Sequence, residues 1–268
     1  MSNRRKFIKN FGLGVVGLTM INHELIAQED VKRITILHTN DMHSRIEPFS
    51  SGSFKGIGGM AQRSSIINEI RKKEKNVLLF DAGDIFQGTP YFNFYGGELE
   101  FKLMSQMKYD AATLGNHDFD NGLDGLKKQL KHASFPFVCA NYDFSRTILK
   151  NSFNPYKIFV KDGVKVGVFG IGVELNGLVP KELYKETKYL DPLIEANKIS
   201  DKLKNKKGCD LIVCLSHLGL MYNSNKVSDL VIAQKSKHID LIIGGHTHSF
   251  LEKPILETNL DGKKVIIN

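Results

Sequence analysis

Short apolar runs alternate with amphipathic stretches from about residue 31 to the end of the chain. Apolar runs of four to eight residues predict buried strands, whereas apolar residues spaced three and four apart predict helices. In 61–73, for example, Ile66, Ile67 and Ile70 fall on one face of a helix. The pattern predicts strands at 31–38, 77–80, 109–114, 135–140, 157–160, 164–171, 210–215, 240–243, 254–258 and 263–267. It predicts helices at 61–73, 98–107, 123–132, 192–206 and 227–235.

The order of these elements indicates the fold class. Strands that alternate with helices favour an α/β fold with largely parallel pairing. Two Asp-Gly pairs, Asp162-Gly163 and Asp261-Gly262, separate neighbouring apolar runs and predict antiparallel hairpins. The sequence contains no internal repeat, so we expect one α/β domain over 29–268.

The first 28 residues have the pattern of an export signal. The basic residues Arg4, Arg5 and Lys9 precede the apolar stretch 11–21, which is too short to span a bilayer. The arginine pair resembles a twin-arginine signal, and the basic start of a general secretion signal is the alternative. We therefore predict a signal peptide at 1–28 and a soluble, periplasmic mature chain without stable membrane insertion.

Charge and cysteine content narrow the function classes. The formal net charge is +8, of which the first 28 residues carry +3, and the remaining excess would favour anionic ligands. The basic residues are spread along helix-like stretches such as 71–75 and 202–207, so solvated helix faces are the expected interpretation. The basic residues do not form a stripe interleaved with aromatic residues, so the sequence does not favour nucleic-acid binding. Three cysteines are too few for a disulfide scaffold, and we interpret them as small buried side chains.

Five polar clusters follow directly after five of the predicted strands. They are Asp41-Met42-His43, Gly83-Asp84, Gly115-Asn116-His117-Asp118, Ser216-His217 and Gly244-Gly245-His246-Thr247-His248. In α/β sheets ligands bind beyond the carboxyl ends of the strands, so the clusters are expected to converge on one rim. Imidazoles mixed with carboxylates and an amide oxygen suit zinc, manganese or iron better than calcium.

The spacing within two clusters adds a geometric expectation. Asp41 and His43 are two residues apart, as are His246 and His248, and on an extended backbone such pairs leave on the same side. Each pair is therefore expected to reach a metal ion from one loop. Any single cluster is equally compatible with a turn or a buried histidine, and it is the five together that predict a metal site.

These motifs resemble the calcineurin-like metallophosphoesterases, and most closely their 5′-nucleotidase branch. The similarity runs from 34–43 through 81–90 and 109–122 to 244–248, which is nearly all of the chain after the signal. The resemblance implies the metallo-dependent phosphatase fold, a four-layer α-β-β-α sandwich of two mixed sheets.

The resemblance also implies roles for individual residues. It assigns Asp41, His43 and His248 to a first divalent metal ion, Asn116, His217 and His246 to a second, and Asp84 to both as a bridge. It assigns His117 as the catalytic histidine and Asp120 as its orienting partner. For Asp118 a structural role is expected, with a more direct role as the alternative. Two divalent ions can activate water and clamp an in-line displacement at phosphorus.

The expected function is therefore hydrolysis of phosphate esters, most closely that of a 5′-nucleotidase-type phosphomonoesterase acting on nucleotides. Hydrolysis of cyclic phosphodiesters or of nucleotide-sugar pyrophosphates is the alternative within the same fold. Many 5′-nucleotidases carry a C-terminal nucleotide-binding domain, which we do not expect within these 268 residues. We expect the catalytic fold to run somewhat beyond Asn268. A further alternative is a metal-binding subunit that is active only with a separate nucleotide-binding partner chain.

Four aromatic residues lie close to the Asp84 cluster in the sequence. They are Tyr91, Phe92, Phe94 and Tyr95. Aromatic side chains usually bury, so packing is the expected role and contact with a substrate is the alternative.

Overall fold

The structure is a computed structural model that describes residues 31–268, so the predicted signal peptide lies outside the described residues. Within the described part, none of the helices combines the length and the apolar character needed to cross a membrane. The three cysteines of this part are free and buried, which confirms their interpretation.

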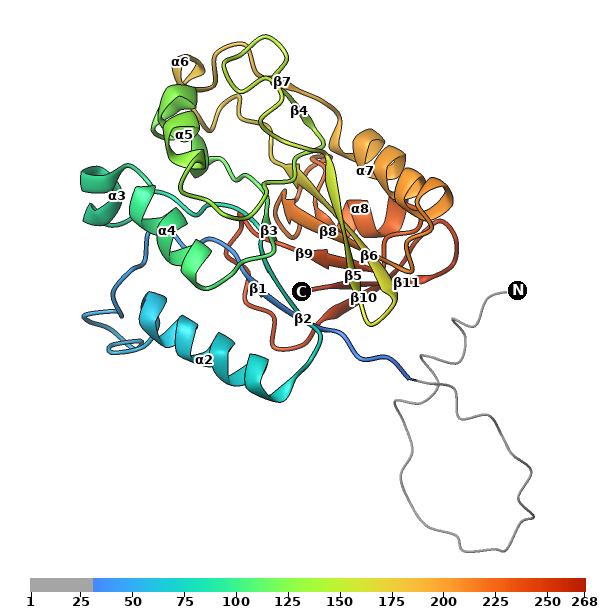
Figure 1. Ribbon diagram of the computed structural model, residues 1–268. Coiled ribbons are helices and arrows are strands. Elements are labelled where there is room, and N and C mark those ends of the chain that lie inside the picture. The colour runs from blue at the N-terminus through green and yellow to red at the C-terminus, as the bar shows by residue number, and fades with distance from the viewer. Residues whose placement is uncertain (1–30) are drawn as a thin grey trace, which may run out of the picture. The chain divides into compact units, whose positions relative to one another are not determined.

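Two sheets form the centre of the fold (Figure 1). The smaller sheet has the order β1 (Thr35–Thr39), β2 (Val77–Asp81), β3 (Ala111–Ala112), and its strands are parallel. The larger sheet has the order β10 (Ile255–Thr258), β11 (Lys264–Ile267), β9 (Leu241–Ile243), β8 (Leu211–His217), β6 (Val164–Gly172), β5 (Tyr156–Lys161). The short strands β4 (Tyr142–Asp143) and β7 (Lys188–Tyr189) pair antiparallel beside them.

Helices cover the outer faces of both sheets. The helices are α2 (Gly59–Lys73), α3 (Pro90–Tyr95), α4 (Glu98–Gln106), α5 (Gly122–Leu130), α6 (Lys181–Tyr184), α7 (Pro192–Asp201) and α8 (Asp229–Lys235), with a 3-10 turn η1 (His117–Phe119) and a π-helical turn η2 (Lys202–Lys206). Figure 1 shows α2, α4 and α5 on one side of the sheets and α7 and α8 on the other. The predicted four-layer order is confirmed.

Successive side chains of the strands point to opposite faces of each sheet and belong to three different apolar clusters. In β2, Leu78 and Phe80 pack between the sheets, while Leu79 packs against residues of α2, α4 and α5. In β8, Val213 points into the space between the sheets and Ile212 toward α7 and α8. Both faces of these strands are buried, which explains why their sequences read as continuous apolar runs.

The smaller sheet differs from the prediction of two mixed sheets. Only the larger sheet is mixed, since β5–β6 and β10–β11 are antiparallel and its other pairs are parallel. Both antiparallel pairs turn at the predicted Asp162-Gly163 and Asp261-Gly262 sites. The strands of the smaller sheet are instead joined through helices, and such crossovers produce parallel neighbours.

The predicted strand at 135–140 is wrong as a continuous element. Phe137 and Val138 form only isolated bridges, to Ala112 and Asn154 respectively. The reason is a change of partner: Val138 N–H bonds to Ala112, and Ala140 N–H bonds to Gly170 on the other sheet. The segment therefore passes from one sheet to the other without a ladder on either.

Several predicted helices have different ends: α2 begins at Gly59, for example, and α5 ends at Leu130. The segment 192–206 is α-helical only to Asp201 and continues as η2. Helix α8 begins at Asp229 and not at Val227, because the Ser228 hydroxyl accepts a hydrogen bond from Val231 N–H and caps the helix.

The parallel strands bring their carboxyl ends to one rim. Strands β1, β2 and β3 are parallel in one sheet, and β6, β8 and β9 are parallel in the other. Segments far apart in the sequence therefore leave the two sheets side by side, which positions the polar clusters together.

Candidate metal centre

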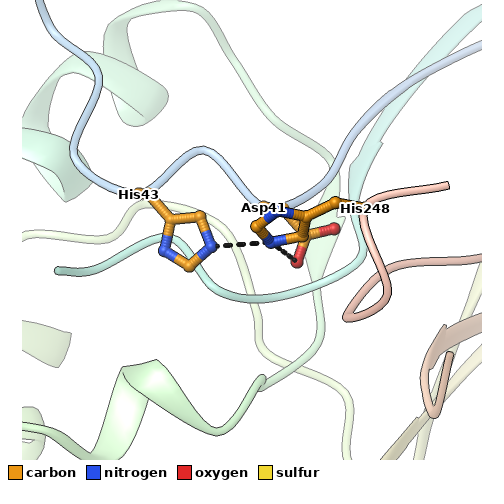
Figure 2. Close-up of side chains that lie close together, drawn as sticks. All are labelled: Asp41, His43 and His248. Carbon is orange, nitrogen blue, oxygen red and sulfur yellow. Dashed lines mark hydrogen bonds and ion pairs between the residues drawn. The ribbon is translucent and has the colours of Figure 1, made fainter. Parts of the chain in front are cut away.

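The first group of metal-binding side chains comes from two distant loops. Asp41 and His43 follow β1, and His248 follows β9 (Figure 2). Their ligand atoms all lie within 4.8 Å of one another. His43 Nε2 is 3.1 Å from His248 Nε2, and His248 Nε2 is 3.4 Å from Asp41 Oδ1. Two imidazoles and a carboxylate that converge in this way form a donor set suited to a transition metal.

A second group combines Asp84, His217 and His246, again with ligand atoms within 4.8 Å. The His217 ring is fully buried, and its Nδ1 bonds to the Ala82 carbonyl oxygen at 2.7 Å, which directs Nε2 toward the group. Burial, followed by the neighbouring His217, lowers the pKa of His246 to about 4. The His246 ring is therefore neutral, which is the form that binds metals.

Buried polar atoms without partners test whether the site fits a metal. Asn116 is buried, and its Oδ1 has no hydrogen-bond partner among the described residues. His217 Nε2 faces the Asp84 carboxylate, whose Oδ2 lies at 3.0 Å. Buried acceptors are rarely left unsatisfied, so the Asn116 oxygen fits a metal ligand role. The facing imidazole and carboxylate fit a cation in place of the proton between them.

Asp84 lies between the two groups. Its Oδ2 is 3.0 Å from His217 Nε2 and 3.9 Å from His43 Nε2, which belongs to the first group. Burial alone would raise the pKa of Asp84, but the adjacent His217 offsets it and holds the pKa at about 2. The carboxylate is thus ionised and within reach of both groups.

The ligand loops are not extended, contrary to the geometric expectation from residue spacing. Asp41, His43, Asp84, His246 and His248 all have positive φ, between 44° and 76°. Non-glycine residues seldom adopt this conformation, and clusters of them mark functional sites. His246 and His248, although only two residues apart, fall into different groups.

Close backbone packing requires a glycine beside Asp84. A Cβ atom at Gly115 would lie 2.1 Å from Asp84 Oδ1. Any side chain at 115 would therefore displace the shared carboxylate, which explains the glycine at the start of the Gly115-Asn116-His117 cluster.

Asp118 organises the loops without facing the cavity. Its fully buried carboxylate accepts hydrogen bonds from the N–H groups of Asp84, Ile85, Phe86 and Gly115, at 2.8 to 3.2 Å. These four bonds join the loop after β2 to the loop after β3. The geometry therefore favours the structural role expected for Asp118.

His117 lies beside the first group but outside both. Its ring centroid is 5.2 Å from that of His43, and its Nδ1 is 2.8 Å from Asp120 Oδ2. The hydrogen bond with Asp120 raises the pKa of His117, and partial burial opposes that shift. His117 is thus oriented by a carboxylate while remaining half-exposed.

A cavity of about 510 Å³ opens onto these residues. It is lined by His43, Asp84, Gln87, Asn116, His117, Leu178, His246 and His248. Gln87 and Leu178 were missed by sequence reasoning, because neither a glutamine nor a leucine in a loop carries a chemical signal.

The aromatic residues of 91–95 do not line this cavity. Phe92 packs against the core beneath the smaller sheet, as expected. Phe94 and Tyr95 are exposed, which contradicts the packing expectation for both. Tyr91 is partly buried, and its ring stacks on that of Tyr95 with the centroids 6.4 Å apart.

Two buried carboxylates behind the metal groups also escaped the sequence analysis. Asp81 accepts hydrogen bonds from the Thr39 hydroxyl at 2.6 Å and from Gly83 N–H at 2.9 Å. Asp229 accepts a hydrogen bond from the Ser216 hydroxyl. Asp81 had a detectable signal, since it ends an otherwise apolar strand, whereas Asp229 sits in an amphipathic segment where a carboxylate is ordinary.

Comparison with known proteins agrees with this geometry. Residues 34–250 match the model of the calcineurin-like phosphoesterase family. The 5′-nucleotidase of Vibrio cholerae is 37% identical over 226 residues, covering 80% of this chain and 40% of that protein. The snake venom 5′-nucleotidase of Naja atra is 41% identical over 228 residues, covering 81% of this chain and 41% of that protein.

A solved structure supports the same relationship. The 5′-nucleotidase precursor from Thermus thermophilus superposes with a TM-score of 0.78 at 37% identity, covering 88% of this chain and 48% of that one. The chain spans less than half the length of each of these three relatives. Because the family match covers most of its length, the chain belongs to the calcineurin-like phosphoesterase family.

Proposed function

We propose that this chain is a two-metal hydrolase of phosphate esters and that its substrate is a nucleotide 5′-phosphate. One observation carries the proposal: two groups of metal-binding side chains meet at Asp84, beside a histidine that belongs to neither group. An oriented histidine next to a paired metal site is an arrangement suited to phosphoryl transfer to water.

Within this proposal, Asp41, His43 and His248 hold one divalent ion, and Asn116, His217 and His246 hold the other. Asp84 contributes to both, which its ionised carboxylate supports. Zinc, manganese and iron match the mixture of imidazole and carboxylate. When bound, the pair of ions activates water and neutralises the charge of the phosphate.

His117 supplies the proton. Its Nδ1 is engaged with Asp120, so Nε2 is the nitrogen that serves the cavity. A protonated Nε2 donates to the leaving alkoxide oxygen as the ester bond breaks. Asp120 fixes the ring orientation and stabilises the charged imidazole.

The nucleotide assignment rests on the 5′-nucleotidase relatives named above. Cyclic phosphodiesters and nucleotide-sugar pyrophosphates would use the same groups and are the alternative substrates. The predicted signal peptide and the venom and bacterial relatives support action outside the cytoplasm, in the periplasm.

A second candidate function is a metal-binding subunit that needs a separate partner chain for activity. Its support is the cavity lining, whose eight described residues include no Phe, Tyr or Arg to hold a base or a second phosphate. The partner chain would supply those groups. The match covers only 40% of the Vibrio cholerae relative, which leaves room for them in the rest of that protein.

The test is phosphate release from AMP by the mature chain loaded with manganese or zinc, beside p-nitrophenyl phosphate. Hydrolysis of both, abolished by chelator, is the expected result. Hydrolysis of the simple ester alone would favour the partner-dependent function. Release from neither, by folded protein holding two ions, would overturn the hydrolase proposal for the chain on its own.

A further inference from the structure

Asp229 is a buried carboxylate behind the second metal group. It is the first residue of α8, and its side chain is 1% exposed. Its Oδ1 accepts a hydrogen bond from the Ser216 hydroxyl at 2.5 Å. Ser216 immediately precedes His217, so this bond joins α8 to the end of β8 where a metal-binding imidazole leaves the sheet.

Two further hydrogen bonds fix the backbone on the other side of His217. The Ser216 hydroxyl that donates to Asp229 also accepts a hydrogen bond from Leu218 N–H at 3.3 Å. The backbone N–H of Asp229 donates to the Gly219 carbonyl at 2.9 Å. The residues on both sides of His217 are thus hydrogen-bonded, directly or through Ser216, to the side chain and backbone of Asp229.

The second carboxylate oxygen reaches the neighbouring strand. A Cβ atom at Gly244 would lie 2.5 Å from Asp229 Oδ2, so this oxygen rests against the Gly244 backbone. Gly244 follows β9 and precedes His246 by two residues. A single carboxylate therefore contacts the exits of β8 and β9, the two strands that present His217 and His246.

We propose that Asp229 is a positioning residue that holds His217 and His246 at the spacing the second metal ion requires. The inference rests on the proposed two-metal function. Of the first group, only His248 follows β9, whereas Asp41 and His43 follow β1, which Asp229 does not contact, so the first site is affected less. Partners that orient metal ligands in this way contribute on the order of 10–100-fold to metal affinity.

The experiment is calorimetric titration of the metal-free protein with Mn²⁺. It compares wild type with Asp229→Ala, Asp229→Asn and Ser216→Ala. A control is Asp110→Ala, because Asp110 Oδ2 also accepts a partly buried hydrogen bond, from Leu79 N–H at 2.8 Å, away from the metal groups. Thermal melts report whether each variant remains folded.

The expected result is selective loss at one site. Asp229→Ala weakens the second of two Mn²⁺ sites by about 10–100-fold and the first by less than about threefold. Ser216→Ala has a similar but smaller effect. Asp229→Asn recovers part of the affinity, because its amide oxygen can still accept the serine hydroxyl. Asp110→Ala keeps the Mn²⁺ affinity of both sites, even where its melting temperature falls as much as that of Asp229→Ala.

Two outcomes would overturn the positioning role. One is unchanged affinity at both sites in folded Asp229→Ala protein or, where that variant does not fold, in both Asp229→Asn and Ser216→Ala. The other is equal weakening of both sites in the Asp229 variants and in Asp110→Ala, which would reflect general destabilisation. Wild-type protein that binds two Mn²⁺ ions but hydrolyses no ester would overturn the proposed function and leave the affinity comparison to decide the role of Asp229.

Discussion

Nδ1 of His117 lies 2.8 Å from Oδ2 of Asp120, and the two side chains stand on one turn of chain at the edge of the metal cavity. The hydrogen bond engages Nδ1 and leaves Nε2 of the ring available for proton transfer. Since His117 lies outside both metal-binding groups, its contribution to catalysis can be separated from metal binding.

His117→Ala is expected to retain two bound ions and lose turnover by about 10²–10⁴-fold, the range for an acid–base group. The measurements are phosphate release from AMP and metal content of the purified protein. Asp120→Asn should give a smaller loss, because the ring remains but is less well oriented. Unchanged turnover in His117→Ala would rule out the catalytic assignment.

Asp84→Asn is expected to weaken both metal sites, by at least about tenfold each, because a neutral amide replaces the carboxylate within reach of both groups. Metal titration and metal content check this. Asp124→Asn, which removes an exposed carboxylate paired with Lys185, serves as control and should keep both ions. Two tightly held ions in Asp84→Asn would contradict a bridging role.

The site residues could be predicted because each carries a chemical signal at a strand end. His246 and Asn116, for example, follow strands whose apolar runs are unmistakable, and parallel strands meet at a common rim. The α/β class was likewise predictable from the alternation of strands and helices, whereas the four-layer order came from the family resemblance. What spacing alone could not provide was the loop geometry, because Asp41 and His43, both at positive φ, donate backbone hydrogen bonds to the distant Gly83 and Asp84 carbonyls.

Long-range partners account for two further errors. The segment 135–140 has the composition of a strand, but its bonds are divided between Ala112 and Gly170 on different sheets. Asp229 was missed for a similar reason, since its role depends on contacts with Ser216 and Gly244 that only the tertiary structure creates.

Asp118→Ala is expected to lower the free energy of unfolding by about 3–5 kcal/mol, because four buried N–H groups lose their acceptor. Urea denaturation of the metal-free protein measures this. Asp118→Asn should fall between Asp118→Ala and wild type, since one oxygen still accepts. A loss under about 1 kcal/mol in Asp118→Ala would mean that water replaces the carboxylate at little cost.

Asp81 makes a prediction about pH. Burial raises its pKa from 3.8 to about 8, against the opposing hydrogen bond from Thr39. Between about pH 4 and pH 8 the folded protein keeps this proton while the unfolded chain releases it. The contribution of Asp81 to stability is therefore present at low pH and is lost as the pH rises toward 8, by about 1.4 kcal/mol per pH unit.

Asp81→Asn removes this dependence, because the amide stays neutral at every pH. Its oxygen can accept from Gly83 N–H, and its NH₂ can donate to the Thr39 hydroxyl, which lies 2.9 Å from the Tyr109 hydroxyl. Urea denaturation of both metal-free proteins at pH 5, 6.5 and 8 should show the variant gaining stability relative to wild type as the pH rises. Other buried carboxylates are common to both proteins and cancel in the difference. Parallel curves would mean that Asp81 is ionised in the folded protein, with its charge stabilised by the Thr39 and Gly83 hydrogen bonds.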